Sequence, residues 1–282
     1  MPAVLVVIFS FFALIFPSFS AEFRYGYGTF SVKNKIFGFS NRLEDKVSVF
    51  SISEFHKNVL SSGLFYGYNL SYILSEKEKK ILDLYNSSVE PFPTDYKPVM
   101  EYRLEGFDGQ LEAGYDFIKK NNYFLGIGGL LGISLPYIRN YNAKNNSQTT
   151  LRYLPDSKTK IKTYRVGISV KGAYKLFQRI YLKSGLSYGW QTGKVKNSLI
   201  GINSSVNGEY GNVYAGIDVY LLKEKVDLGI FSLSPQLYFS FGYIYEMWKL
   251  KDVNINNNAI SINRDNLKIE NSYLFSGIGY SF

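Results

Sequence analysis

The feature that most constrains this chain is a two-residue alternation of large apolar side chains with small or polar ones. In residues 64–74, Leu64, Tyr66 and Tyr68 occupy one set, while Phe65 and Gly67 belong to the other. Successive side chains of a β-strand point to opposite faces, so this period predicts strands rather than helices. About ten such segments follow one another, which predicts an all-β chain.

The ionisable residues of the later strands fall into one of the two alternating sets. Beyond Glu76, the large apolar set has no ionisable side chain in the central part of its strands. The opposite set contains Glu112, Asp116, Arg165, Lys171, Lys183, Asp218 and Glu246. A charge that faces lipid at the bilayer midplane costs roughly 2–4 kcal/mol. The segregation therefore predicts lipid outside, a polar interior, and these seven residues as lumen charges.

The connections between the strands are of two alternating kinds. Short ones fall near His56, Lys119, Leu176 and Lys223, and long polar ones at residues 33–46, 76–98, 139–160, 192–207 and 249–266. A transmembrane antiparallel up-and-down β-barrel alternates short periplasmic turns with long extracellular loops in this way. We predict such a barrel with about ten strands (roughly 8–12). A secreted soluble β-sandwich is the alternative fold, although nothing in a sandwich requires short and long connections to alternate.

The last strand of the chain ends on an aromatic residue. Ile278, Tyr280 and Phe282 are spaced by two and lie in one alternating set. This ending resembles the C-terminal strand of bacterial outer-membrane β-barrel proteins, which typically ends in Phe with apolar or aromatic residues at the third and fifth places from the end. The resemblance implies that the barrel-assembly machinery recognises this strand, and that outer-membrane lipid and lipopolysaccharide surround the protein.

The first residues have the shape of a secretory signal. Residues 4–16 are a near-continuous apolar run that ends at Pro17, and Ser18, Ser20 and Ala21 suit signal peptidase. The run is shorter than the roughly 20 apolar residues of a spanning helix. No Lys or Arg precedes it, which departs from the usual signal. We predict a cleaved signal peptide at 1–21 and a barrel at 22–282, located in the outer membrane of a Gram-negative cell.

The sequence offers little material for catalysis. There is no Cys, which excludes disulfides, zinc–thiolate sites and thiol catalysis, and there is one histidine, His56. Ten-stranded barrels include the omptin surface proteases, which use an Asp pair and an Asp–His pair. This chain has no Asp-x-Asp motif, and His56 falls at a predicted periplasmic turn. We predict no catalytic residue, metal, cofactor or nucleic-acid partner.

Two kinds of function fit these observations. The first is a structural barrel or a narrow, porin-like pore for small solutes or ions, in which the lumen charges form a salt-bridge network. The second is a surface adhesion or binding barrel that acts through the loops at 76–98 and 139–160 on an extracellular ligand that the sequence does not identify. An outer-membrane hydrolase is less favoured, because the class generally uses histidine.

Overall fold

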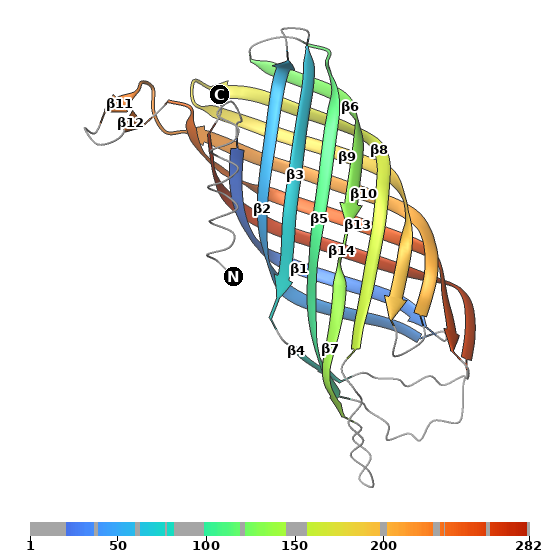
Figure 1. The fold of residues 1–282 in the computed structure, drawn as a ribbon. Helices are drawn as coiled ribbons and strands as arrows, with labels where there is room; N and C mark the ends of the chain where they lie inside the picture. Colours follow the sequence, from blue (N-terminus) through green and yellow to red (C-terminus); the bar gives the residue numbers. More distant parts are fainter. Residues whose placement is uncertain are drawn as a thin grey trace.

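The fold is a closed β-barrel, seen in a computed structural model (Figure 1). The structure describes residues 21–36, 39–59, 63–76, 78–81, 99–118, 122–144, 157–197, 202–227, 232–233, 235–257 and 260–280. Residues 1–20 of the signal peptide predicted at 1–21 and the terminal Phe282 lie outside the described residues, whereas Ala21, the last residue of that prediction, belongs to the first strand. None of the described helices is long and apolar enough to cross a membrane.

Ten long strands form the wall. They are β1 (Ala21–Ile36), β2 (Phe39–Val59), β3 (Leu64–Ser75), β5 (Val99–Asp116), β6 (Tyr123–Ser134), β8 (Ser157–Phe177), β9 (Ile180–Asn197), β10 (Ile202–Tyr220), β13 (Leu237–Asn257) and β14 (Ile260–Tyr280). Each pairs antiparallel with the next along the chain, and β14 closes the barrel against β1 from Ala21↔Tyr280 to Asn34↔Leu267. The predicted ten-stranded up-and-down β-barrel is confirmed.

Short strands extend the wall beyond two of the long ones. β4 (Glu78–Ile81) follows β3 and pairs with β5, and β7 (Tyr137–Lys144) follows β6 and pairs with β5 and β8. Pro136 separates β6 from β7 because proline has no backbone N–H to donate. The wall stays hydrogen-bonded there: the Leu135 amide donates to Phe107, and the Ile161 amide donates to the Pro136 carbonyl at 2.9 Å.

The long strands change the character of both faces about halfway along. On β8, Val166 and Ile168 are exposed on the outside, and the buried Arg165 lies inside. Further toward the β7–β8 connection, Lys162 is exposed on the outside and the buried Ile161 lies inside. The half that ends in the short turns, called the lower half here although it is at the top of Figure 1, therefore has an apolar exterior and a polar interior. The upper half, at the long-loop end, has a charged exterior and an apolar core. Such an inversion is expected at the level where a membrane-spanning barrel leaves the hydrocarbon layer.

The inversion explains two irregularities in the alternation of the sequence. In β2, Phe50 and Ile52 face outward in the lower half, while Val47 and Val49 are buried inside the upper half, so the apolar set changes phase without any break. In β5 the same change occurs around residues 106–109, where the sequence suggests a bulge. That suggestion is wrong, because the register with β3 is continuous from Leu64↔Tyr115 to Leu74↔Glu105.

Several predicted loops are strand instead. Residues 33–46, 192–207 and 249–266 lie mostly in the paired ends of β1–β2, β9–β10 and β13–β14. Their polar composition makes these strand ends resemble loops in the sequence. In the upper half the outward positions of a strand carry charged residues, whereas in the lower half they carry apolar ones. Within 76–98 and 139–160, residues 78–81, 139–144 and 157–160 are also strand. The charged run at 76–84 could also suggest a short helix, which is wrong for residues 78–81 because they form β4. Residues 82–98 and 145–156 lie outside the described residues.

The lower, short-turn end also differs from expectation. His56 lies within β2, opposite Tyr66, rather than in a turn. The turn that follows includes Gly63, whose φ of 85° favours glycine. The connection predicted as a short turn at Lys223 contains the two-stranded sheet of β11 (Val226–Asp227) and β12 (Ser232–Leu233), which projects from the barrel in Figure 1. This is therefore a long connection on the predicted periplasmic side.

Candidate functional site

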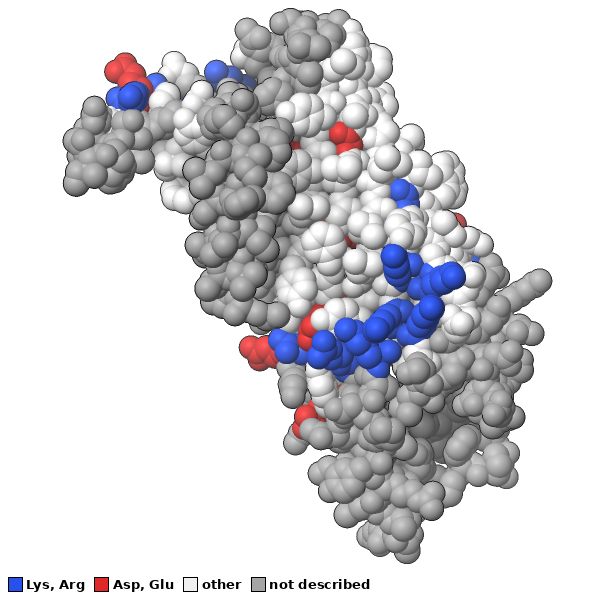
Figure 2. Space-filling view, in the orientation of Figure 1, with Lys and Arg blue, Asp and Glu red and all other residues white. Residues whose placement is uncertain are grey.

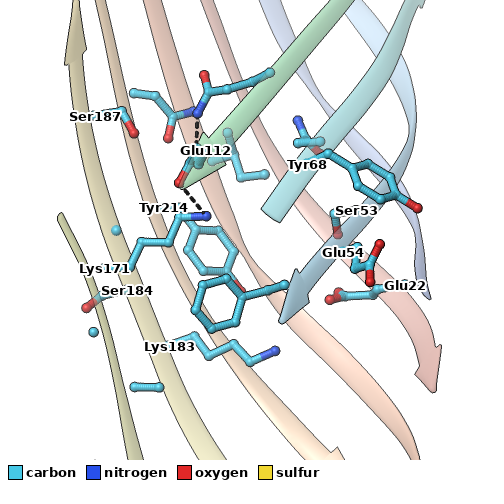
Figure 3. Close-up of a pocket in the computed structure, with 18 of the residues that line it drawn as sticks. Glu22, Ser53, Glu54, Tyr68, Glu112, Lys171, Lys183, Ser184, Ser187 and Tyr214 are labelled. Atoms are coloured by element: carbon cyan, nitrogen blue, oxygen red, sulfur yellow. Dashed lines mark hydrogen bonds and ion pairs between the residues drawn. The ribbon is translucent and has the colours of Figure 1, made fainter. Parts of the chain in front are cut away.

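The lower half of the lumen contains a polar cavity of about 430 Å³. Its lining side chains come from strands on all sides of the barrel (Figure 3). Glu22, Tyr181, Tyr220 and Tyr238 lie near the short-turn ends of their strands, so the cavity faces the predicted periplasmic side. Its upper limit is formed by Tyr210, Glu246 and neighbouring side chains.

Ion pairs line the cavity. Lys183 of β9 pairs with Asp218 of β10, two adjacent strands whose inward faces meet there. Glu22 of β1 pairs with Arg24 at 2.6 Å and accepts a hydrogen bond from the Ser240 hydroxyl of β13. Asp218 and Glu22 thus each have a cation beside them, which limits the cost of removing both charges from water. Glu54 of β2 is also buried in this lining, but it forms no ion pair with another described residue. The cavity wall carries charge without a strong excess of either sign.

The two acids predicted on β5 have separate environments. Glu112 forms an ion pair with Lys171 of β8 at 2.8 Å, shown as a dashed line in Figure 3. Asp116 is buried at the lower end of β5, where its Oδ1 accepts hydrogen bonds from the backbone amides of Ile118 (3.0 Å) and Leu125 (3.3 Å). Asp116 therefore stabilises the β5–β6 end of the barrel, and Glu112 belongs to the cavity.

A layer of polar side chains crosses the lumen above the cavity. Arg165 of β8 forms a bidentate ion pair with Asp108 of β5, at 2.7 and 2.6 Å, and donates to Ser134 of β6 at 2.7 Å. The Ser134 hydroxyl also accepts a hydrogen bond from the indole Nε1 of Trp248, on β13, at 2.9 Å. The Arg165 guanidinium lies 3.9 Å from the centroid of the Tyr210 ring. Side chains from β5, β6, β10 and β13 therefore meet Arg165 of β8 in this layer.

Glu246 extends the same layer toward β14. Its carboxylate accepts hydrogen bonds from Asn271 at 3.0 Å, Tyr210 at 3.3 Å and Asn212 at 3.4 Å. Above the layer the lumen contains buried apolar side chains, which include Leu104, Leu250, Ile269, Val32 and Val206. The interior is thus mainly polar in its lower half and mainly apolar above the layer, whereas the sequence predicts a polar interior throughout.

Three charged residues of these networks, Asp108, Glu22 and Arg24, are not among the seven lumen charges that the sequence predicts. Asp108 falls within the stretch that suggests a bulge, so its phase is lost. If one phase is kept along β5, Asp108 belongs to the same inward set as Glu112. Glu22 and Arg24 alternate with outward aromatic residues at the start of β1, and the same reasoning places them inside. Among the described residues, no cluster of three acidic or histidine side chains could hold a metal ion.

Comparison with solved structures defines the class of fold. The outer membrane protease OmpT from Escherichia coli superposes with a TM-score of 0.55 at 12% identity, covering 93% of this chain and 97% of that one. The toluene transporter TodX from Pseudomonas putida (TM-score 0.38, 10% identity, 93% and 90% covered) and OprG from Pseudomonas aeruginosa (0.33, 10%, 94% and 98%) are more distant.

The fold is therefore that of an outer-membrane β-barrel. No protein-family model matches the chain, and no curated protein matches it. At 12% identity the similarity to OmpT shows the fold alone, so the activity of that protease is not transferred to this chain.

Proposed function

We propose that this protein is a closed structural barrel of the bacterial outer membrane, which carries a strand-built platform on the outer surface and does not act as an open pore. The observation that supports this most is the layer of Arg165, Asp108, Ser134 and Trp248 across the lumen, with apolar packing above it. A permeating ion would have to separate a buried bidentate ion pair and then pass an apolar core.

The size of the barrel favours the same function. A barrel of about eight strands is just wide enough for side chains to fill its interior, and 16–18 strands are needed for an open aqueous channel. Ten strands with inward Tyr, Trp and Arg side chains lie near the filled limit. The polar cavity below the layer then serves as a hydrated vestibule rather than part of a continuous path.

The length of the strands supports the outer platform. A membrane-spanning strand needs about 9–11 residues. β2, β8, β13 and β14 each have 21 residues, so roughly half of each strand extends beyond the membrane. The predicted surface-binding role would be performed by this upper half, whose apolar core holds it rigid.

Export and assembly follow the predictions from the sequence. The segment 1–21 acts as the cleaved signal, and the barrel-assembly machinery recognises the final strand through Ile278, Tyr280 and Phe282. Ile278 faces outward and is exposed, and Tyr280 lies opposite Leu237 of β13, next to the closing pair of Gly279 and Glu22. These positions suit a strand that is recognised before the barrel closes.

The test is single-channel conductance of the refolded mature chain in planar bilayers. The wild-type barrel should give no discrete current steps. The combined variant Arg165→Ser, Trp248→Ala, Leu104→Ala and Leu250→Ala should conduct, because it opens both the polar layer and the apolar packing above it. Trp190→Ala is the matched control: this tryptophan is 62% exposed on the outer wall and should stay silent when replaced.

Discrete steps in the wild type would refute the closed barrel. If Lys183→Glu then changed the ion selectivity of those steps, the narrow pore would replace it as the function. Folding of each variant is checked first by heat-modifiable gel migration, so that a silent variant is known to be a barrel.

A further inference from the structure

Six cationic side chains form one patch on the outer wall, where the apolar exterior ends. This basic patch consists of Arg139 on β7, Lys158, Lys160 and Lys162 on β8, and Lys194 and Lys196 on β9. They face outward, because the residues that alternate with them, such as Ile161 and Val195, are buried in the core. Figure 2 shows Lys and Arg side chains gathered in one band across this face.

The cations of the basic patch lie directly opposite one another on paired strands. The opposed pairs are Arg139↔Lys158, Lys160↔Lys196 and Lys162↔Lys194. Like charges directly opposite on neighbouring strands destabilise a sheet. Among the described residues, none of these lysines has a carboxylate within 4 Å. The opposed cations therefore repel one another in the barrel alone, and a bound anion would relieve that repulsion.

Cations at the same level elsewhere on the wall have acidic partners. On the side formed by β1 and β14, Glu270 accepts hydrogen bonds from Lys33 at 2.5 Å and Lys268 at 2.6 Å. Beside the basic patch, the buried Glu105 lies on β5 and is paired with Arg103 at 3.2 Å. β9 is three strands from β5, which is roughly 14 Å at the usual strand spacing. Most of the patch is therefore not neutralised by the protein.

The position of the patch indicates which anion it meets. Tyr164 and Trp190 are the aromatic outward residues below it, and Val166 and Ile168 continue the exposed apolar surface toward the short turns. Tyr and Trp mark membrane–water interfaces, and Lys and Arg just beyond them are attracted to anionic headgroups. Lys162 lies 5.2 Å from the centroid of the Tyr164 ring, so the cationic and aromatic levels are in contact.

We propose that the basic patch binds the phosphate groups of an anionic glycolipid in the outer leaflet, while the acyl chains of that lipid lie against Val166, Ile168 and Leu186. The lipid is favoured over an acidic protein or a nucleic acid because the patch continues without a gap into the apolar band on the same strands. A lipid contacts both surfaces at once, and it supplies the anions that the opposed cation pairs lack.

The experiment compares binding of bisphosphorylated lipid A, dephosphorylated lipid A and inorganic phosphate to the refolded full mature chain in neutral detergent, measured by native mass spectrometry. The variant K160S/K162S/K194S removes three charges of the patch. The control variant K33S/K249S/K251S removes three charges from β1 and β13, outside the patch. A cation near a charged lipid surface contributes roughly fivefold in affinity, so the patch variant should bind phosphorylated lipid A on the order of 100-fold more weakly.

The control variant should bind like wild type, and dephosphorylated lipid A should bind weakly to all three proteins. Equal binding by the patch variant and wild type would overturn the proposal. Equal binding of dephosphorylated lipid A would show that only the apolar band matters, and saturation by inorganic phosphate alone would show a phosphate site without a lipid. Each of these two results would also overturn the proposal that the patch binds an anionic lipid. All of these outcomes are independent of whether the lumen conducts.

A second measurement compares the stability of the patch variant and of wild type toward urea, without lipid and with it, and the order of the two proteins should differ between these conditions. In neutral detergent the patch variant should resist urea better than wild type, because it removes opposed like charges. With phosphorylated lipid A present, wild type should gain stability and the patch variant should not. A patch variant that is less stable than wild type in neutral detergent would contradict the argument from opposed charges, and would point to a packing role for the lysine stems.

Discussion

The ion pair between Arg165 and Asp108 is the lumen interaction whose loss should lower the free energy of unfolding most. The side chains of these two residues are 1% and 2% exposed, and the guanidinium donates to both carboxylate oxygens. Asp108→Asn keeps the shape of the side chain and removes its charge. The Arg165 cation would then remain buried with an amide in place of its carboxylate partner.

The expected cost follows from what remains around Arg165. Removing one partner of a buried ion pair typically costs about 3–5 kcal/mol, because the other charge stays uncompensated. Ser134 and Gln110, at 2.7 and 3.0 Å, continue to accept hydrogen bonds from the guanidinium, and the Tyr210 ring stays beneath it. These contacts favour the smaller value of that range, so we expect a loss of about 3 kcal/mol in the free energy of unfolding.

The measurement is equilibrium urea unfolding of the refolded barrel in lipid vesicles, followed by tryptophan fluorescence. Glu209→Gln is the matched control, because Glu209 pairs with Lys251 at the surface, where the two side chains are 28% and 56% exposed. A pair of that kind contributes roughly 0–1 kcal/mol. A double variant with Arg165→Met and Asp108→Leu should recover most of the loss, since it leaves no unpaired charge.

A loss below about 1 kcal/mol in Asp108→Asn would refute this reasoning. It would mean that the layer is hydrated and that water replaces the carboxylate, which would also weaken the case for a sealed lumen. Failure of the double variant to recover stability would instead indicate that the hydrogen bonds of the layer, rather than its charge balance, hold the strands together.

Three further variants test the packing, the lipid face and the upper rim. Gly28→Ala should lose roughly 1–3 kcal/mol in urea unfolding, because its Cβ would overlap the backbone of β14, whereas Gly129→Ala, whose Cβ would have its nearest neighbour at 3.9 Å, should be neutral. Leu274→Lys places a charge at a lipid-facing position that is 68% exposed and should cost roughly 2–4 kcal/mol; an unchanged urea midpoint would contradict that orientation. Partial burial raises the pKa of Glu270, but hydrogen bonds from two lysines outweigh it and lower this pKa to about 2. The contribution of Glu270 to the free energy of unfolding is therefore complete above about pH 4.5 and is lost as the pH falls toward 2. The difference in unfolding free energy between wild type and Glu270→Gln should shrink over that range, and a constant difference would contradict the assignment.

The alternating pattern is sufficient to predict the strand count, the antiparallel order and the outward face of the lower half. It does not predict where the strands end. In a soluble sheet one face stays apolar from end to end, and a strand appears to stop when that pattern stops. In this chain the pattern changes phase instead, as in β2, where the outward Phe50 is followed toward the rim by the inward Val49 and Val47.

The lumen contacts depend on information that the local pattern does not contain. Alternation places Arg165 inside, but its partner Asp108 lies on β5, separated from β8 by β6 and 57 positions away in the chain. Which inward residues share a level depends on the stagger of the strands, and therefore on the registers of every intervening pair. The hydrogen bond from Trp248 to Ser134 across the lumen depends on the same accumulated registers.

The inversion of the two faces links the sealed lumen to the basic patch. Below the level of Tyr164, lipid covers the apolar exterior, so apolar packing inside is not needed to keep the wall together. Above that level the exterior is in water or among headgroups, and the wall must bury apolar side chains inside, as a soluble barrel does. In the proposed closed barrel, the core of Leu104, Leu250 and Ile269 closes the lumen because the strands extend beyond the membrane. The cations appear outside at the level where that core begins, since both changes occur where the hydrocarbon layer ends.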